Sequence, residues 1–400
     1  MQTERRPQEN IEHHGWWKRL DPALRWALGI YLIARVLASA WAAVVANLAP
    51  IHVPYIGHPV YEMVHQAYPH NSRLLNLLLG VWYRWDTGWF TKVALQGYSP
   101  DDGSATVSPL YPLLIRWLGG LLGGEYLLAA LVISNVALVG GLVLLYKLVV
   151  LDFSDCVARR SVVYQVAIPA GFFLLAGYTE PLYFCLALLS VYAARKSSWL
   201  LAGVAALLTS LTRMQGWVLV FPLAYEALVQ ARMRPLRAWP GLLAAAGGPI
   251  GTLSYNLYLA MAGLPGMSVT YRNDWKVHYT APWTSVAMAI NSLITGQASF
   301  QDWVNAFVVF LSLFLIVISV RKLRPTYWLY SIVSQLIFLM GYLEGEQLHS
   351  MMRYTLVLFP NTIALALVTR HRWMSGLVTF AFVLLQVVLL GMFIRWIWVA

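Results

Sequence analysis

The chain has 400 residues, of which 59% are hydrophobic and only 11% are charged. Soluble proteins carry about 25% charged residues, so this composition excludes an ordinary soluble protein and indicates a polytopic membrane protein. The net charge of +11 does not indicate a nucleic-acid partner, because the basic residues lie in short clusters between apolar runs. Cys156 lies in a basic loop and Cys185 inside an apolar run, so the sequence predicts no disulfide and no thiolate metal site.

Apolar runs follow one another almost continuously from residue 24 onward. A helix needs about 20 apolar residues to cross a hydrocarbon core of roughly 30 Å, so the shorter runs require tilting or local thinning of the bilayer. The eleven candidate spans are 24–49, 125–149, 162–178, 180–194, 199–212, 214–230, 241–262, 303–320, 326–343, 353–369 and 373–395. The sequence therefore predicts an all-α helical bundle, with a tail at 1–23 and a single membrane-embedded domain at 24–400.

Basic clusters predict the orientation of this bundle, because Lys and Arg are enriched in short cytoplasmic loops. If the tail is cytoplasmic, every second loop should be basic. Five internal loops fit, with Arg159 and Arg160, Arg195 and Lys196, Arg232, Arg234 and Arg237, Arg321, Lys322 and Arg324, and Arg370 and Arg372. The scheme requires that residues 109–122 do not cross, and their prolines, Arg116 and glycine pair favour an interfacial or re-entrant helix. Two large loops, 50–124 and 263–302, then lie on the extracytoplasmic side of the cell membrane.

The stretch 81–98, VWYRWDTGWFTKVALQGY, follows the first span and places an acid among aromatic residues. Asp86 has Arg84 and Lys92 close by in sequence, a mixture that is costly to hold beside a membrane unless something uses it. Asp86 is therefore the catalytic candidate, and Arg84 and Trp85 are candidate substrate contacts. The alternative is a solvated acid within a belt of interfacial Trp and Tyr side chains.

Three further stretches place polar side chains at the outer ends of predicted spans. They contain Tyr178 and Glu180, Arg213 and Gln215, and Arg353 and Tyr354. Glu180 is either a simple helix cap or a buried acid that needs an arginine or a sugar hydroxyl as partner. Each arginine is either an interfacial anchor or a phosphate ligand. Two arginines on the side that bears Asp86 favour an anionic substrate, so all six residues are predicted substrate contacts.

Histidines and acids in the first large loop are possible ligands for a divalent metal. They are His52, His58, His65, His70, Asp101 and Asp102. Their spacing is looser than that of common metal motifs, such as two histidines on one helical face. We predict no metal site and no cofactor, with a divalent ion in this loop as the alternative.

Five segments resemble the PIG-V-type mannosyltransferases, the family that includes the enzyme adding the second mannose of glycosylphosphatidylinositol anchors. The segments, in the family's order, are RWDTGWFTKVALQGY, SPLYPLLIRW, IPAGFFLLAGYTEPLYF, SLTRMQGW and MMRYTLVLFP. The chain departs from the family at Ile168, where Asn is usual, at Thr179, where Ser is common, and at Met214 and Gln215, which replace Ser and Asn. It is also shorter and plainer than eukaryotic members, which indicates a prokaryotic member.

The resemblance implies a helical bundle of the GT-C superfamily and an inverting glycosyltransferase. The donor would be a polyprenyl-phosphate-linked sugar, by family habit mannose, and the acceptor a lipid-linked or other glycan. Asp86 would be the general base, while Arg213 and Arg353 would stabilise the leaving lipid phosphate. The implied partners are the donor, the acceptor and membrane lipids. Two alternatives stay open: a transporter or lipid flippase, and a non-catalytic assembly subunit in which Asp86 pairs structurally with an arginine.

Overall fold

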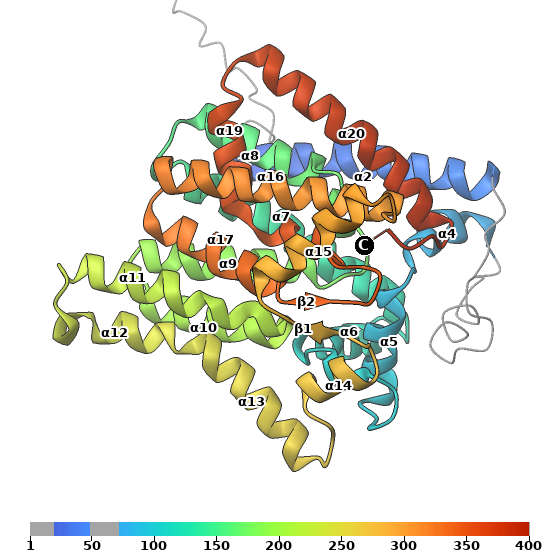
Figure 1. Ribbon diagram of the computed structural model, residues 1–400, viewed down its shortest axis with the longest axis horizontal. Helices are drawn as coiled ribbons and strands as arrows, with labels where there is room; N and C mark the ends of the chain where they lie inside the picture. Colours follow the sequence, from blue (N-terminus) through green and yellow to red (C-terminus); the bar gives the residue numbers. More distant parts are fainter. Residues whose placement is uncertain (1–19, 49–71, 400) are drawn as a thin grey trace, which may run out of the picture.

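The computed structural model describes residues 20–48 and 72–399 (Figure 1). Its first part contains α2 (Pro22–Leu48), α4 (Arg73–Leu78), η1 (Gly80–Trp82), α5 (Asp86–Gln96), η2 (Ser104–Thr106) and α6 (Leu110–Leu121). The middle part contains α7 (Tyr126–Val149), α8 (Asp155–Ala167), η3 (Gly171–Leu174), α9 (Glu180–Arg195), α10 (Trp199–Thr212), η4 (Met214–Leu219), α11 (Val220–Gln230), α12 (Pro235–Ala245) and α13 (Gly247–Met261).

The last part contains the only β-structure of the described residues. Its elements are α14 (Met267–Asn273), β1 (His278–Tyr279), α15 (Pro282–Ile294), α16 (Phe300–Lys322), α17 (Pro325–Phe338), β2 (Gly341–Tyr342), α18 (Met351–Tyr354), η5 (Thr355–Val357), α19 (Phe359–Val368) and α20 (Arg372–Ile394). Strands β1 and β2 pair antiparallel, with His278 opposite Tyr342. This short sheet joins the two outer loops that carry it.

All eleven predicted apolar runs contain helix, which confirms the all-α polytopic membrane fold. The number of simple spans is lower than eleven, however. By length and composition, four helices of the described chain can each cross a membrane, α2, α7, α16 and α20, and a fifth span results if the bent pair Met351–Val357 and Phe359–Val368 is counted as one. Other runs are interrupted: Pro169 follows the end of α8 within 162–178, and the run 214–230 begins with η4 before α11. Proline removes a helical hydrogen bond, so α8 cannot continue through it unchanged.

Close packing of the central helices depends on small residues, as is usual where helices meet inside a membrane. Helix α7 packs on α9 at Gly141, where an added Cβ would lie 2.5 Å from the ring of Phe184. Helix α10 packs on α13 at Gly251, where a Cβ would lie 2.6 Å from the carbonyl oxygen of Leu207. Large apolar side chains face outward instead, for example Val36, which is 65% exposed. Such faces are suited to lipid.

The bent pair ends one helix and begins the next at an angle of 82°. Two side chains satisfy carbonyl groups at this break. Gln165 on α8 donates a hydrogen bond to the carbonyl oxygen of Leu356 at 2.7 Å, and Tyr330 on α17 donates one to that of Val357 at 3.0 Å. Irregular backbone at membrane depth is stable only when its polar groups are satisfied within the protein. The break is therefore held by α8 and α17.

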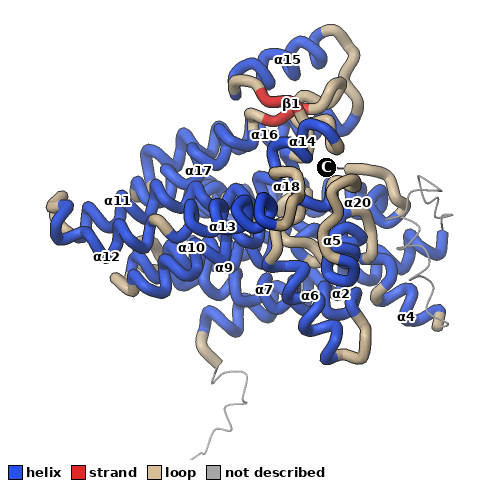
Figure 2. The backbone as a smooth tube through the Cα atoms, turned by 90° about the horizontal axis from the view of Figure 1, so that it is seen from below, coloured by secondary structure: helices blue, strands red, loops and turns tan. Residues whose placement is uncertain are grey.

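The bundle has two chemically different ends. Figure 2 shows α5, α14, α18 and β1 gathered at one side of the molecule, away from the connection between α11 and α12. Helix α9 begins among the predicted site residues at Glu180 and ends at Arg195, which forms an ion pair with Asp152 at 2.6 Å. Residues 109–122 contain the 12-residue helix α6, Leu110–Leu121, which buries Tyr111 and exposes Trp117. A helix of this length and one-sided burial fits an interfacial position.

Candidate active site

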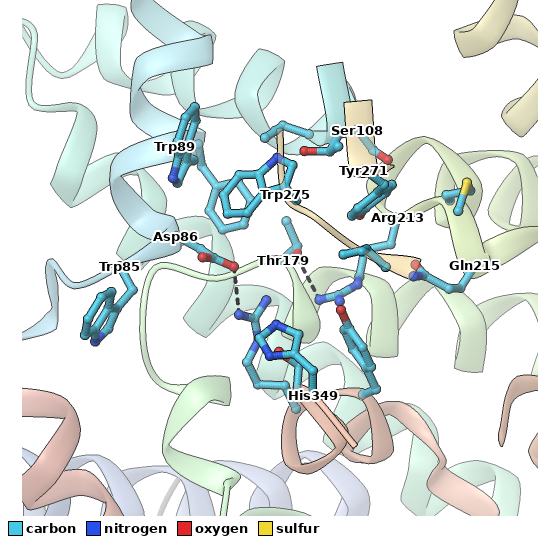
Figure 3. Close-up of a pocket in the computed structure, with 18 of the residues that line it drawn as sticks. Trp85, Asp86, Trp89, Ser108, Thr179, Arg213, Gln215, Tyr271, Trp275 and His349 are labelled. Atoms are coloured by element: carbon cyan, nitrogen blue, oxygen red, sulfur yellow. Dashed lines mark hydrogen bonds and ion pairs between the residues drawn. The ribbon is translucent and has the colours of Figure 1, made fainter. Parts of the chain in front are cut away.

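A cavity of about 540 Å³ lies where α5, α14, α18 and the junction of α10 with η4 meet (Figure 3). Six of the residues predicted from the sequence line it: Trp85, Asp86, Arg213, Gln215, Arg353 and Tyr354. They come from three regions that are far apart in the chain. The structure does not place Arg84, Tyr178 or Glu180 among the lining residues.

Asp86 owes its position to an unusual backbone at the residue before it. Trp85 has φ of 52° and ψ of −116°, a conformation that L-residues with side chains rarely adopt. The ring of Trp85 packs against Trp396 and Trp398 at centroid distances of 5.4 and 5.1 Å, which holds this conformation in place. Asp86 then becomes the first residue of α5, where the helix dipole stabilises a negative charge.

Two acids and two arginines form one connected cluster. Nη1 of Arg353 lies 2.7 Å from Oδ2 of Asp86, and its Nε lies 2.9 Å from Oε1 of Glu180. Nη1 of Arg213 lies 2.5 Å from the same oxygen of Glu180. The Asp86 side chain is 24% exposed, whereas that of Glu180 is fully buried. Asp86 is therefore the acid that a substrate can reach, and Glu180 lies behind the arginines.

Tyr178 and Glu180 thus support the cavity rather than line it. Arg353 lies over the ring of Tyr178 at 5.1 Å, and the Tyr178 hydroxyl donates to the carbonyl oxygen of Arg84 at 3.2 Å. Glu180 reaches the arginines because it begins α9, directly before Pro181 in the first turn. The prediction that these two residues touch the substrate is not what the geometry indicates.

Arg84 is turned away from the cavity. Its guanidinium donates to the carbonyl oxygens of Ile394, Gly80 and Tyr83 at 2.9 to 3.0 Å. Ile394 is the last residue of α20, so its carbonyl lacks a partner within the helix and is a ready acceptor for a cation. Arg84 fastens the segment before Asp86 to the end of α20, and its predicted role as a substrate contact does not fit this position.

Several cavity residues were not predicted from the sequence. They include Tyr271, Trp275, Glu346 and Trp398. Burial raises the pKa of the Tyr271 phenol, so its hydroxyl stays a neutral hydrogen-bonding group. Tyr271 and Trp275 lie in the predicted loop 263–302, which was the only sequence signal for them. Trp398 follows the last apolar run and carried no signal.

An aromatic wall and an acid–histidine pair complete the cavity. Trp275 packs on Trp89 at a centroid distance of 5.2 Å and donates from Nε1 to the carbonyl oxygen of Gly103 at 3.1 Å. Nδ1 of His349 lies 2.7 Å from Oε2 of Glu346, and this hydrogen bond lowers the pKa of the Glu346 carboxyl. Figure 3 shows Trp89, Trp275 and Tyr271 on one side of Asp86 and His349 on the other.

The metal alternative lies mainly outside the described residues. His52, His58, His65 and His70 all fall in 49–71, and Asp102 forms an ion pair with Lys92. Within the part of the chain that the structure describes, no three His, Cys, Asp or Glu side chains are grouped to hold a metal ion. The absence of a cofactor stays a prediction.

The described chain is a mainly helical membrane protein whose cavity contains an accessible acid and two arginines. Residues 62–232 match the family model described as Mannosyltransferase (PIG-V). The match supports the assignment of this chain to the PIG-V-type mannosyltransferases, and it covers Asp86, Glu180 and Arg213 but not Arg353. No curated protein matches the chain. The protein is a multi-pass membrane glycosyltransferase, so it acts on a sugar donor and a glycan or lipid acceptor.

Proposed function

We propose that the protein transfers mannose from a polyprenyl-phosphate-linked donor to a hydroxyl of a lipid-linked or other glycan acceptor. The observation that carries this proposal is the ion pair of 2.7 Å between the exposed acid Asp86 and Arg353, with Arg213 joined to the same cluster through Glu180. Group transfer from a phosphate needs a base for the nucleophile and cations for the leaving group. The cavity has both within one ion-pair network.

Asp86 acts as the general base in this reaction. Its carboxylate takes the proton from the acceptor hydroxyl while the hydroxyl oxygen forms a bond to the anomeric carbon of the sugar. The bond between that carbon and the phosphate oxygen breaks, and its electron pair stays on the phosphate. Because attack comes from the face opposite the phosphate, the configuration at the anomeric carbon inverts.

The arginines stabilise the negative charge that grows on the leaving phosphate. Both guanidinium groups line the cavity while their other edges are bonded to Glu180, so they are oriented before the substrate binds. Cations fixed in a site with little water stabilise a developing charge more than water does. A planar guanidinium also matches the geometry of phosphate oxygens.

A second cavity supports a donor that carries a lipid chain. It has a volume of about 330 Å³ and is lined by α5, α6, α10 and α13. Helix α5 contributes to both cavities, with Phe90 lining the first and Val93 and Ala94 the second. The lining of the second is mainly apolar, with Pro112, Leu113 and Leu211 among its residues. An isoprenyl chain fits this surface. The proposed function includes a position of the site at the extracytoplasmic side of the cell membrane, as the basic loops predict.

Replacement of the proposed base tests the reaction. We expect Asp86→Asn to remain folded and membrane-inserted but to lose transfer by at least about 100-fold, because general bases contribute roughly 10²- to 10⁴-fold. The assay supplies the purified protein with radiolabelled polyprenyl-phosphate mannose, other polyprenyl-phosphate sugars and nucleotide sugars. Asp102→Asn is the matched control, since Asp102 pairs with Lys92 and does not line the cavity. Transfer from nucleotide sugars alone would contradict the proposed donor.

The ion pair between Asp86 and Arg353 is also what a purely structural role predicts. A non-catalytic assembly subunit would need only that the two charges attract. The double variant Asp86→Arg with Arg353→Asp separates the catalytic role from the structural role. It keeps opposite charges at positions 86 and 353 but removes the base from position 86. Loss of transfer in a folded double variant supports the enzyme, and retained cellular function supports the subunit.

A further inference from the structure

Arg353 contacts both acids of the cluster with different atoms of one guanidinium group. Its Nε is bonded to Glu180, and its Nη1 is bonded to Asp86. We propose that the phosphate of the substrate replaces Asp86 as the partner of Nη1, and that this exchange releases the base for the acceptor. The inference rests on the proposed function and adds an order of events to it.

The contact with Glu180 is the permanent one. Glu180 is fully buried and also holds Arg213 at 2.5 Å, so losing its partners would leave a desolvated charge. The rings of Phe173 and Tyr178 lie 5.6 and 5.1 Å from the Arg353 guanidinium carbon and confine it further. Arg353 is therefore fixed at its Nε edge and cannot follow an anion out of the site.

The contact with Asp86 is the one that can be exchanged. The Asp86 side chain is 24% exposed and lines the cavity, so water and substrate can take over its interactions when Arg353 leaves. The charges of Asp86 and Glu180 balance those of Arg213 and Arg353 in the cluster. A phosphate entering this neutral cluster must compete with a carboxylate for the same cation, and the more solvated carboxylate is the easier one to displace.

The exchange orders the reaction. Before the donor binds, the carboxylate of Asp86 is engaged by Arg353. Once phosphate takes Nη1, Asp86 can accept the hydrogen bond of the acceptor hydroxyl, and Arg353 already contacts the group on which charge will grow. The base and the cation are thus brought into their working states by the same event.

Phosphate binding to Asp86→Asn tests the exchange. If Asp86 competes with phosphate for Arg353, removing its charge should strengthen the binding of inorganic phosphate and of farnesyl phosphate by roughly two- to fivefold, the range expected for loss of one partly exposed ion pair. Affinities are measured by calorimetry on the purified protein in detergent. If Asp86 instead orients Arg353 for phosphate, the same variant binds both probes more weakly, which overturns the proposal. Asp86→Ser is the second variant, for use if the Asn protein is unstable.

Glu346→Gln is the matched comparison, because Glu346 lines the same cavity but is paired with His349. If the phosphate affinity of Glu346→Gln rises as much as that of Asp86→Asn, the effect is a general one of negative charge, and the exchange is overturned. If Asp86→Asn binds farnesyl phosphate more tightly but not inorganic phosphate, the apolar chain causes the effect, and the exchange is again overturned. The transfer assay separates this inference from the proposed function: tighter phosphate binding without any sugar transfer by the natural protein leaves the exchange standing and refutes the reaction. If the natural protein transfers sugar and Asp86→Asn binds phosphate more weakly, the reaction stands and the exchange is refuted.

Discussion

Glu180 shows how a carboxylate can be fully buried at the start of a short membrane helix. Its charge is desolvated, and the two guanidinium groups that contact it offset that cost. The sequence indicates an acid in need of a partner, but it does not identify the partners, because Arg213 and Arg353 lie 33 and 173 positions away along the chain. The sequence could predict that Glu180 needs a partner, but which arginines pair with it depends on the fold.

Removal of the Glu180 charge should destabilise the protein. We expect Glu180→Gln to lower the free energy of unfolding by about 3–5 kcal/mol, because it leaves the buried Arg353 and the mostly buried Arg213 without their shared counterion. Denaturant titration of the purified protein, followed by far-UV circular dichroism, measures the change. Glu346→Gln is the control and should cost less than about 1 kcal/mol, since its pair with His349 is half-exposed. Equal stability of both variants would contradict the supporting role of Glu180.

Arg84 illustrates the limit of sequence reasoning at the scale of one residue. Its neighbour Asp86 reaches the cavity, but Arg84 precedes the first turn of α5 and points toward the carbonyl of Ile394, which is 310 positions away. Of the three candidates from this stretch, Trp85 and Asp86 line the cavity and Arg84 does not. The directions in which the Arg84 and Asp86 side chains point depend on the backbone of Trp85, and no sequence pattern indicated its positive φ.

The element η4 positions two predicted site residues through a single glycine. Arg213 ends α10 with an extended backbone, and the chain then folds back against the last turns of α10. Gly216 lies so close that an added Cβ would be 2.4 Å from the backbone nitrogen of Ser210. Only glycine permits this approach, so the orientation of Arg213 and Gln215 depends on it.

We expect Gly216→Ala to push η4 away from α10 and to lower transfer at least about tenfold through displacement of Arg213, since small misplacements of catalytic groups are costly. Transfer rate and the midpoint of thermal unfolding should both fall. Gly120→Ala in α6 is the control, because Gly120 is exposed with no atom within 4 Å of the added Cβ, and it should be neutral or stabilising by up to about 1 kcal/mol. If Gly216→Ala behaves like the control, η4 does not position the arginine.

The apolar runs predicted the helices of the bundle well but not their breaks. Hydropathy reports how apolar a segment is, and runs such as 162–178 and 214–230 contain a helix followed or preceded by a 3₁₀ turn. These interruptions bring Tyr178, Glu180 and Arg213 to the cluster. Breaks of this kind are set by tertiary packing, such as the contact at Gly216, and a one-dimensional pattern does not contain that information.

At the scale of the whole molecule, the basic loops and the cavity lie at opposite ends of the bundle, as α9 shows by running from Glu180 to Arg195. This arrangement agrees with the alternation predicted from the basic clusters. The alternation of basic loops therefore predicts that the loops bordering the cavity face away from the cytoplasm.

Cysteine labelling in intact cells tests that orientation. Cys156 is exposed at the start of α8, beside Arg159 and Arg160, and should react with a membrane-impermeant maleimide only after the cells are permeabilised. A second thiol introduced by Gln297→Cys, at an exposed position between α15 and α16, should react without permeabilisation. Cys185 lies within the bundle and serves as the poorly reactive reference. The reverse labelling pattern would place the active site on the cytoplasmic side.

The bend of 82° before α19 has a consequence for how the protein is made. Its Leu356 and Val357 carbonyl groups accept hydrogen bonds from Gln165 and Tyr330, and lipid tails offer no donor that could replace them. Both donors precede the bend in the chain, so a ribosome delivers them to the translocon before residues 351–368 emerge. The bent pair can therefore form these two hydrogen bonds only after α8 and α17 have entered the membrane, and it brings Arg353 to Asp86 after them.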